Sequence, residues 1–294
     1  MVTFYRRLPK FDYIKPKSME EALDLLGEKN HGDVKVYAGG TDVIPRLKSR
    51  LIQTTKVLID LKGIPDLDHI QYDEKDGLRI GALATISSVA HSPQVRENFG
   101  ILSQAAGSIA STQVQNRGTI VGNICNAVPS ADSAPALLCL GAKLSCVSSR
   151  GERLIDIEDF FTGPNRTALN PDELVKEIWI PSMPPQSKGA YIKLSPRRRM
   201  DLAVVGVGAV VVQDKGIVQN VRIALGAVAP TPMRAKRAED MIKGEKVRAD
   251  TVVEAAVTAS AESEPIDDHR ASAEYRRMMV EVLVKRAMNT ALSN

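Results

Sequence analysis

The chain has 294 residues, 44% of them hydrophobic and 25% charged, which is the composition of an ordinary soluble globular protein with two or three domains. No apolar run of about 18 residues occurs and the first seven residues have no apolar segment, so we expect no membrane span, no secretory signal and a cytoplasmic location. The net charge of +4 is small and only 4% of the residues are aromatic, which argues against nucleic-acid binding.

The cysteines and histidines do not form a pattern typical of a metal site. Cys125, Cys139 and Cys146 include no Cys-x-x-Cys pair, and the four histidines are scattered along the chain. We therefore expect buried thiols and no metal or iron–sulfur cluster held by this chain. No nucleophile motif is present in the sequence, so no catalytic residue is assigned, and redox chemistry would have to come from a cofactor.

The first elements in chain order are a helix and several strands. Ser18 and Glu21 form a capping box that opens a helix. Strand-like runs follow at 34–38, 56–61 and 78–82. Thr85 is placed to cap the next helix, and a helix rich in small residues is expected over 101–110. The segment 111–117 is too polar to belong to the core.

A hairpin and a linker are predicted in the middle of the chain. The runs 143–148 and 153–155 flank a turn at 149–152, which is a hairpin signal. Another strand is expected over 174–180. The segment 182–189 is polar and rich in proline, so we place a domain boundary near it.

Beyond that boundary the pattern changes from strands to helices. Strand-like runs occur at 190–194, 202–212 and 219–227. Asp250 is expected to cap a helix over 251–260, and Ser272 to open a long final helix. That helix would carry four apolar residues on one side, Met278, Met279, Val282 and Leu283. Strands followed by helices indicate an α+β domain with a small antiparallel sheet.

The segment 36–42 is the first of two glycine-rich segments. Gly39 and Gly40 follow a strand, and such a pair can adopt positive φ and turn successive N–H groups to one side, which forms a nest for phosphate. Thr41 adds a hydroxyl donor, and Asp42 could accept from a sugar hydroxyl or orient the loop. A tight turn without a ligand is the alternative for this segment alone.

The segment 119–126 is the second, beside another apolar, strand-like run. Thr119 and Gly122 are followed by the amide donors Asn123 and Asn126. An irregular connection rich in turn-forming residues is the alternative. A dinucleotide has two phosphates and needs an extended contact surface, so two such loops in one chain together predict a dinucleotide site.

Three other features of the second half of the chain bear on a role in binding. The run 206–211 has only part of the Rossmann glycine spacing and lies in an apolar stretch, so we interpret it as a buried strand. The arginines at 197–199 could meet a diphosphate, a nicotinamide dinucleotide or an acidic partner, or could form a solvated loop. Lys193 lies within a strand-like run and could point inward.

The two glycine-rich segments carry a family resemblance. Ala-Gly-Gly-Thr-Asp at 38–42, and Thr-Ile-x-Gly-Asn-Ile-x-Asn with Ser-Ala-Asp at 119–132, resemble the flavin signatures of the FAD-binding subunit of molybdenum-containing hydroxylases. This family includes xanthine dehydrogenase, which looks the closest branch, and carbon monoxide dehydrogenase. Further landmarks in the expected order extend the resemblance over nearly the whole chain, at 161–164, 197–203, 229–232 and 271–277.

The resemblance implies an α+β fold of two domains. The first, over 1–178, would be an FAD-binding domain of the vanillyl-alcohol-oxidase (PCMH) type, with subdomains of about 1–57 and 58–178. The second, over 179–294, would contain an antiparallel sheet and helices.

The resemblance also implies the cofactor contacts. The first segment would wrap the FAD diphosphate, chiefly through main-chain N–H groups, while Thr119 and Asn123 would donate to phosphate or ribityl oxygens. Cys125 and Asn126 would stand near the isoalloxazine ring, and Asp132 would accept from the cofactor. The full set of implied contacts is Lys35, Val36, Tyr37, Ala38, Gly39, Gly40, Thr41, Asp42, Val43, Ile109, Ala110, Thr119, Gly122, Asn123, Cys125, Asn126, Asp132, Leu169 and Lys193.

The implied function is that of an electron-transfer flavoprotein subunit. Electrons would come from a molybdopterin centre on a large partner chain, through two [2Fe–2S] clusters on a small partner chain, to this FAD and then to NAD⁺ or another acceptor, within a heterotrimer. The FAD would be bound non-covalently, because His31, the histidine nearest the first segment, precedes the strand. The alternatives are a stand-alone flavoprotein oxidoreductase with its own substrate pocket, and a non-catalytic nucleotide- or nucleic-acid-binding protein that uses 197–199.

Overall fold

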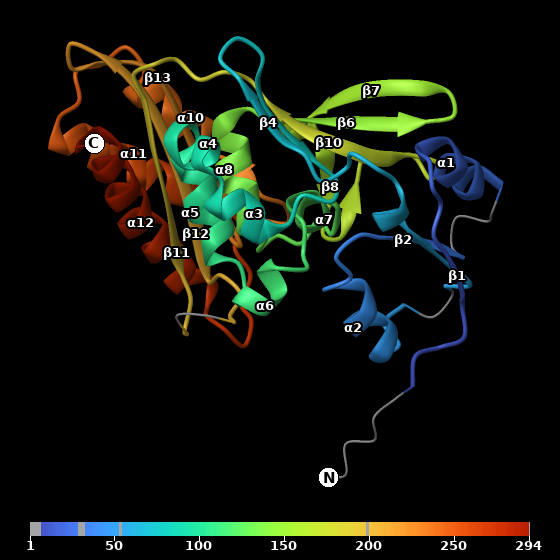
Figure 1. Cartoon of the computed structure of the whole chain (residues 1–294). Coiled ribbons are helices and arrows are strands. Elements are labelled where there is room, and N and C mark those ends of the chain that lie inside the picture. The colour runs from blue at the N-terminus through green and yellow to red at the C-terminus, as the bar shows by residue number, and fades with distance from the viewer. Residues whose placement is uncertain (1–6, 29–32, 53–54, 198–199, 294) are drawn as a thin grey trace.

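The structure is a computed structural model that describes residues 7–28, 33–52, 55–197 and 200–293 (Figure 1). Helices are combined with one parallel sheet and with antiparallel sheets, which confirms the predicted α+β class. Figure 1 shows the C-terminal helices on one side, the N-terminal sheet on the other, and a group of short helices between them. Within the described ranges, no helix is long and apolar enough to cross a membrane.

The N-terminal part is a small parallel sheet with a helix packed on it. Its strands lie in the order β1-β3-β2 and span Asp12–Ile14 (β1), Val34–Tyr37 (β2) and Val57–Asp60 (β3), the last followed by a 3₁₀ turn, η1 (Leu61–Gly63). Helix α1 (Met19–Glu28) begins at the predicted capping box. The Ser18 hydroxyl accepts from the N–H of Glu21 at 3.1 Å, and the Glu21 carboxylate accepts from the N–H of Lys17 at 2.8 Å. The predicted boundary between the two subdomains of the FAD-binding domain, at about residue 57, falls on the first residue of β3.

The middle part is a five-stranded antiparallel sheet with short helices. Its order is β4-β5-β10-β6-β7, with β4 at Ile70–Asp73, β5 at Gly77–Gly81, β10 at Leu174–Ile180, β6 at Lys143–Ser148 and β7 at Gly151–Asp156. The predicted hairpin is confirmed as β6 and β7. Thr85 caps the next helix as predicted, because its hydroxyl accepts from the N–H of Ser88 at 3.0 Å.

The helices of this part come mainly between β5 and β6. They are α3 (Ile86–His91), α4 (Pro93–Asn98), α5 (Gly100–Ser108), α6 (Thr112–Gln115), α7 (Ile120–Cys125) and α8 (Ser133–Leu140). Helix α9 (Ile157–Phe160) and the two-stranded ribbon of β8 (Phe161–Gly163) and β9 (Arg166–Thr167) follow β7. One continuous core joins these helices to the inner face of the five-stranded sheet.

The C-terminal part is a four-stranded antiparallel sheet between two helical layers. Its strands, in the order β11-β12-β13-β14, are Ser187–Leu194, Val205–Asp214, Ile217–Gly226 and Met233–Arg234. One face packs against α10 (Lys236–Ile242), α11 (Ala249–Glu262) and α12 (Ala273–Ser293). The other face packs against α5 and α8, so the central core continues into this sheet (Figure 1).

Strand β12 is buried on both faces, as predicted for the run 206–211. Val207 faces α10–α12, whereas Val210 belongs to the central core. A Cβ added at Gly208 would lie 3.0 Å from the carbonyl oxygen of Pro135 in α8. The glycine therefore lets the helix approach the sheet closely, and the run is a packing feature rather than a nucleotide-binding motif.

Two predicted boundaries in this part are wrong. Strand β11 begins at Ser187, so the polar connection is shorter than the predicted 182–189, because Ser187 and Lys188 already pair with β12. Helix α11 begins at Ala249, and Asp250 lies in its first turn rather than at its N-cap. A carboxylate in the first turn still interacts favourably with the helix dipole.

Helix α12 turns a different face to the core than predicted. Of the four predicted residues only Leu283 is buried, and Met278 is 49% exposed. Arg276 belongs to the buried stripe, since its guanidinium donates to the carbonyl oxygens of Val204 and Ala227 at 2.8 and 2.9 Å, and to Asp268 at 2.7 Å. A buried arginine needs acceptors for its N–H groups, so the side of the helix that carries Arg276 faces these three acceptors. The pattern of apolar residues alone does not predict that an arginine lies on the buried side.

Candidate functional site

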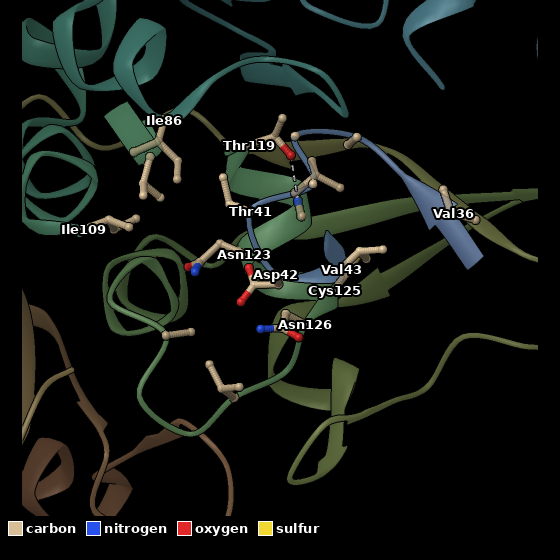
Figure 2. A pocket seen from close by; sticks show the side chains of 18 of the residues that line it. Val36, Thr41, Asp42, Val43, Ile86, Ile109, Thr119, Asn123, Cys125 and Asn126 are labelled. Atoms are coloured by element: carbon tan, nitrogen blue, oxygen red, sulfur yellow. Dashed lines mark hydrogen bonds between the residues drawn. The ribbon is translucent and has the colours of Figure 1, made fainter. Parts of the chain in front are cut away.

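A cavity of about 630 Å³ lies where the two glycine-rich segments meet (Figure 2). This volume is in the range of small-molecule and cofactor sites. Its walls come from the segment after β2, from the turn after α5, from α7 with the connection to α8, and from the loop before β10. Of the predicted cofactor contacts, all except Tyr37 and Lys193 line this cavity.

The first glycine-rich segment touches the two residues directly before the second, Arg117 and Gly118. A Cβ added at Gly39 would lie 2.0 Å from the carbonyl oxygen of Arg117 and 2.7 Å from the Cα of Gly118. A Cβ added at Gly118 would lie 3.2 Å from the hydroxyl of Thr41. At Gly39 the contact is therefore made between backbones, at Gly118 between the backbone and the Thr41 hydroxyl, and both depend on the absence of a side chain at the glycine.

The backbone of the first segment is open to a ligand. Gly40 has φ +75°, which turns the chain into the short helix α2 (Val43–Lys48). In the part of the chain that the structure describes, the N–H groups of residues 39–42 donate no hydrogen bond. Successive N–H groups without an internal acceptor form a site for an anion such as a phosphate.

Tyr37 supports this loop from behind. A Cβ added at Gly40 would lie 2.3 Å from Cε2 of the Tyr37 ring, so the ring packs directly against the glycine. The Nζ of Lys62 lies 3.7 Å from the ring centroid and donates to the carbonyl oxygen of Ala38 at 3.0 Å. Its second acceptor is the buried carboxylate of Asp60 at 2.7 Å. Tyr37 thus holds the loop in place instead of lining the cavity.

The second segment is a helix, so the prediction of a loop beside a strand-like run is wrong. Thr119 is the N-cap of α7, and its hydroxyl accepts from the N–H of Gly122 at 2.9 Å. The apolar residues 120, 121 and 124 face the core, as a helical period requires, although Val121 also reaches the cavity. Figure 2 shows Asn123, Cys125 and Asn126 on the side of the cavity.

The two asparagines present oriented amides. The carbonyl oxygen of Asn123 accepts from the Ser133 hydroxyl at 2.6 Å, and that of Asn126 accepts from Nη1 of Arg46 at 3.0 Å. The amide nitrogen of Asn123 is then left as a donor. That of Asn126 faces the Asp42 carboxylate, whose pKa is raised by burial and lowered in part by this hydrogen bond. Arg46 was missed from the sequence, although it follows Asp42 by one helical turn in α2, and it brings a positive charge to the wall of the cavity.

Ile109 and Ala110 form a strained turn that a buried glutamine holds. Ala110 has φ 44°, which is uncommon for a residue with a side chain. The amide nitrogen of Gln115 donates to the carbonyl oxygens of Gly107 and Ile109 at 3.1 and 2.7 Å. Gln115 is only 4% exposed, so the prediction that 111–117 lies wholly outside the core is wrong at this residue.

Replacing Gln115 by leucine is expected to destabilise the protein by about 2 kcal/mol, because the buried carbonyl oxygen of Ile109 and the partly buried one of Gly107 lose their donor. Chemical denaturation followed by circular dichroism measures this. Gln113→Leu is the matched control, since Gln113 is exposed on the same short helix, and a change below about 0.5 kcal/mol is expected there. Equal effects of both substitutions would contradict the role of Gln115.

Lys193 points inward and reaches the cavity through Asp132. Its Nζ lies 2.7 Å from the Asp132 carboxylate and also donates to the carbonyl oxygens of Ser108 and Asp201 at 3.3 and 2.9 Å. The other Asp132 oxygen accepts from the Tyr191 hydroxyl at 2.9 Å. Burial raises the pKa of Asp132, and the Lys193 charge and the two hydrogen bonds partly oppose that effect. Side chains along a strand alternate between its two faces, so Tyr191 and Lys193 lie on the same face of β11 and both reach Asp132.

The cysteines are not reactive groups in this environment. Cys139 and Cys146 are buried, as predicted, whereas Cys125 is half-buried at the cavity wall. Burial raises the pKa of Cys125 to about 12 and that of Cys146 to about 11, so both thiols are neutral near pH 7. Within the described ranges, no cluster of His, Cys, Asp and Glu side chains could hold a metal ion.

Other residues of the cavity come from separate elements and were not predicted. They include Ile52, Leu61, Ile86, Val114, Val121, Val128, Ser130, Asn165, Glu173, Met200, Asp201 and Leu202. Most are apolar or lie in loops, and only the tertiary structure brings them together. Arg197 pairs with Asp201 at the surface, while Arg198, Arg199 and His31 lie outside the described residues.

Two protein-family profiles match the chain in succession. The FAD binding domain in molybdopterin dehydrogenase matches residues 9–183, and the CO dehydrogenase flavoprotein C-terminal domain matches residues 190–291. The chain belongs to the FAD-binding medium subunits of the molybdenum hydroxylases. In relatives of this kind, the subunit is part of an oxidoreductase complex.

The similarity of these relatives covers nearly the full chain. The chain is 35% identical to the carbon monoxide dehydrogenase medium chain of Hydrogenophaga pseudoflava over 283 residues, which is 96% of this chain and 97% of that one. It is 31% identical to a putative xanthine dehydrogenase FAD-binding subunit of Escherichia coli K12, over 96% of both chains. These identities do not favour the xanthine dehydrogenase branch.

A solved structure supports the same relationship. The carbon monoxide dehydrogenase of Hydrogenophaga pseudoflava that lacks the Mo-pyranopterin moiety of its cofactor contains a chain that superimposes with a TM-score of 0.94 at 36% identity. The superposition covers 98% of this medium subunit and 99% of that chain.

Proposed function

We propose that this medium subunit binds one FAD non-covalently in the cavity and transfers electrons between [2Fe–2S] clusters on a small partner chain and NAD⁺ or another acceptor. It would act in a cytoplasmic heterotrimer whose large chain carries the molybdopterin. The observation that carries the proposal is the contact of the first glycine-rich segment with the residues directly before the second, which brings the free N–H groups of residues 39–42 and the amide donor of Asn123 in α7 to one cavity.

The residues of the cavity fit the parts of FAD. The first segment offers main-chain donors where glycines keep out side chains, and Lys35 and Arg46 add positive charge, which together suits a diphosphate. Ile86, Ile109 and Leu169 provide apolar surface for a ring system and exclude water from it. When bound, FAD accepts electrons one at a time and can release two of them as a hydride. The chain's own residues bind and orient the cofactor and hold neutral donors near it.

Titration of the purified chain with FAD tests this proposal. We expect one flavin per chain with visible absorbance, and full release of the flavin into the filtrate after denaturation. A colourless chain in the presence of FAD would contradict binding, and flavin that stays with the denatured chain would contradict non-covalent attachment. Recovery of an active monomer without molybdenum or iron would instead favour the stand-alone flavoprotein.

A further inference from the structure

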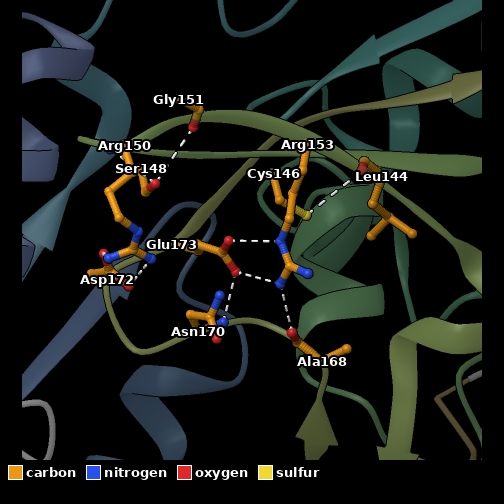
Figure 3. A network of polar contacts seen from close by, with 10 residues as sticks. All are labelled: Leu144, Cys146, Ser148, Arg150, Gly151, Arg153, Ala168, Asn170, Asp172 and Glu173. Carbon is orange, nitrogen blue, oxygen red and sulfur yellow. Dashed lines mark hydrogen bonds and ion pairs between the residues drawn. The ribbon is translucent and has the colours of Figure 1, made fainter.

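An ion pair outside the cavity is connected to one of its walls. The loop between β9 and β10 carries Leu169, which lines the cavity, and Glu173, which lies at the same wall. Arg153, on the outer hairpin strand β7, pairs with Glu173 through two bonds, Nε to Oε1 at 2.7 Å and Nη2 to Oε2 at 2.8 Å (Figure 3). Two parallel bonds fix the orientation of both groups more strictly than one bond would.

The same pair binds the backbone on both sides of Leu169. Nη2 of Arg153 also donates to the carbonyl oxygen of Ala168 at 3.0 Å. Oε2 of Glu173 accepts from the N–H of Asn170 at 2.7 Å. The residue before Leu169 and the residue after it are therefore attached to one guanidinium–carboxylate unit, as Figure 3 shows.

Glu173 is ionised in this arrangement. Its side chain is 4% exposed, and the hydrogen bonds from Arg153 lower its pKa from the ordinary 4.5 to about 2, against the opposing effect of burial. A buried carboxylate that lost its arginine would lack a compensating charge, so the loop would have to move to bring it to water.

We infer that Arg153 and Glu173 are a positioning pair that holds Leu169 against the flavin ring, and this rests on the proposed function that the cavity holds FAD. Arg153 does not line the cavity and acts through the loop. When the pair is intact, Leu169 has little freedom to move away from the ring and water is kept from that side of the site.

A second ion pair on the same loop provides a control. Arg150 pairs with Asp172 at 2.5 and 3.1 Å. The side chains of this pair are 64% and 17% exposed, against 47% and 4% for Arg153 and Glu173, and neither Arg150 nor Asp172 bonds the backbone of residues 168–170 in the described structure. Exposed pairs of this kind contribute little to stability. Arg150→Gln therefore makes the same chemical change as Arg153→Gln, on the same hairpin, without releasing Leu169.

The test measures FAD affinity and the access of iodide to the bound flavin, together with the thermal unfolding of the FAD-free chain. Arg153→Gln is expected to weaken FAD binding about tenfold and to raise quenching by iodide, whereas Arg150→Gln stays within about twofold of the wild type. Leu169→Ala should show a similar loss, and Arg153→Gln should add little to it, because both changes remove the same contact. Arg153→Lys, which keeps the charge and can replace one bond, should lose less and covers the case that Arg153→Gln does not fold.

The outcomes separate this inference from the proposed function. A wild-type chain that binds no FAD overturns both. A wild type that binds FAD, with an Arg153→Gln variant of unchanged affinity and unchanged quenching, overturns the positioning role alone. Fully additive losses in the Arg153→Gln/Leu169→Ala double variant would also overturn it.

Discussion

Gly39→Ala is expected to weaken FAD binding by more than about a hundredfold, which corresponds to roughly 3 kcal/mol. The added Cβ would lie 2.0 Å from the carbonyl oxygen of Arg117, and its other close neighbours are also backbone atoms. No flexible side chain can move aside, so the two glycine-rich segments must separate. The N–H groups of residues 39–42 would then move away from the amide donor of Asn123 in α7, and one continuous binding surface would become two.

Gly107→Ala is the control for this substitution. Gly107 lies within α5, has an ordinary φ, and has no atom within 4 Å of the Cβ that alanine would add. Alanine is favoured over glycine inside a helix by about 0.5–1 kcal/mol, so this variant should be slightly more stable and should keep its FAD affinity. Fluorescence titration of both variants decides the matter. A Gly39→Ala chain that binds FAD as the wild type does would show that the contact between the segments is not needed.

The parts of the site that could be predicted are those with a local signal. A glycine pair directly after a strand indicates a loop that can expose N–H groups, and the alternation along β11 could point Lys193 inward. The second segment was predicted as a loop because its glycine and two asparagines are turn-forming residues. The spacing of the apolar residues 120, 121 and 124 after a threonine cap fits a short helix, and only a residue-by-residue count shows this.

The remaining parts depend on partners far away in the sequence. Arg46 meets Asn126 across 80 residues, and Arg153 meets Glu173 across 20. Gln115 and Arg276 are polar residues in the core, where an apolar pattern places none. Each is buried because backbone carbonyl oxygens of other segments need a donor at that point. These hydrogen bonds depend on the tertiary structure, so the local sequence does not predict them.

Lys193→Met is expected to destabilise the protein by about 3–5 kcal/mol, since it leaves the Asp132 carboxylate buried without its cation. The carbonyl oxygens of Ser108 and Asp201 would lose a donor as well, so both flanking loops of the cavity would loosen. We expect FAD affinity to fall about tenfold as a consequence. Lys188→Met, at an exposed position of the same strand, should change neither quantity.

The pH dependence of this variant distinguishes a lost charge from lost packing. Burial already raises the pKa of Asp132 in the wild type, and removal of Lys193 should raise it further. A carboxyl group with a higher pKa in the folded state keeps its proton there to a higher pH than in the unfolded chain. Above the unfolded-state pKa of about 3.9, the unfolded chain releases this proton first, so the folded state becomes less stable as the pH rises. The stability difference between Lys193→Met and the wild type should therefore be larger at pH 8 than at pH 5.

Asp132→Asn in the Lys193→Met background should remove this dependence and recover part of the stability, because no buried charge is left uncompensated. A difference that stays constant from pH 5 to pH 8, in denaturation experiments at each pH, would instead assign the loss to packing around the lysine stem.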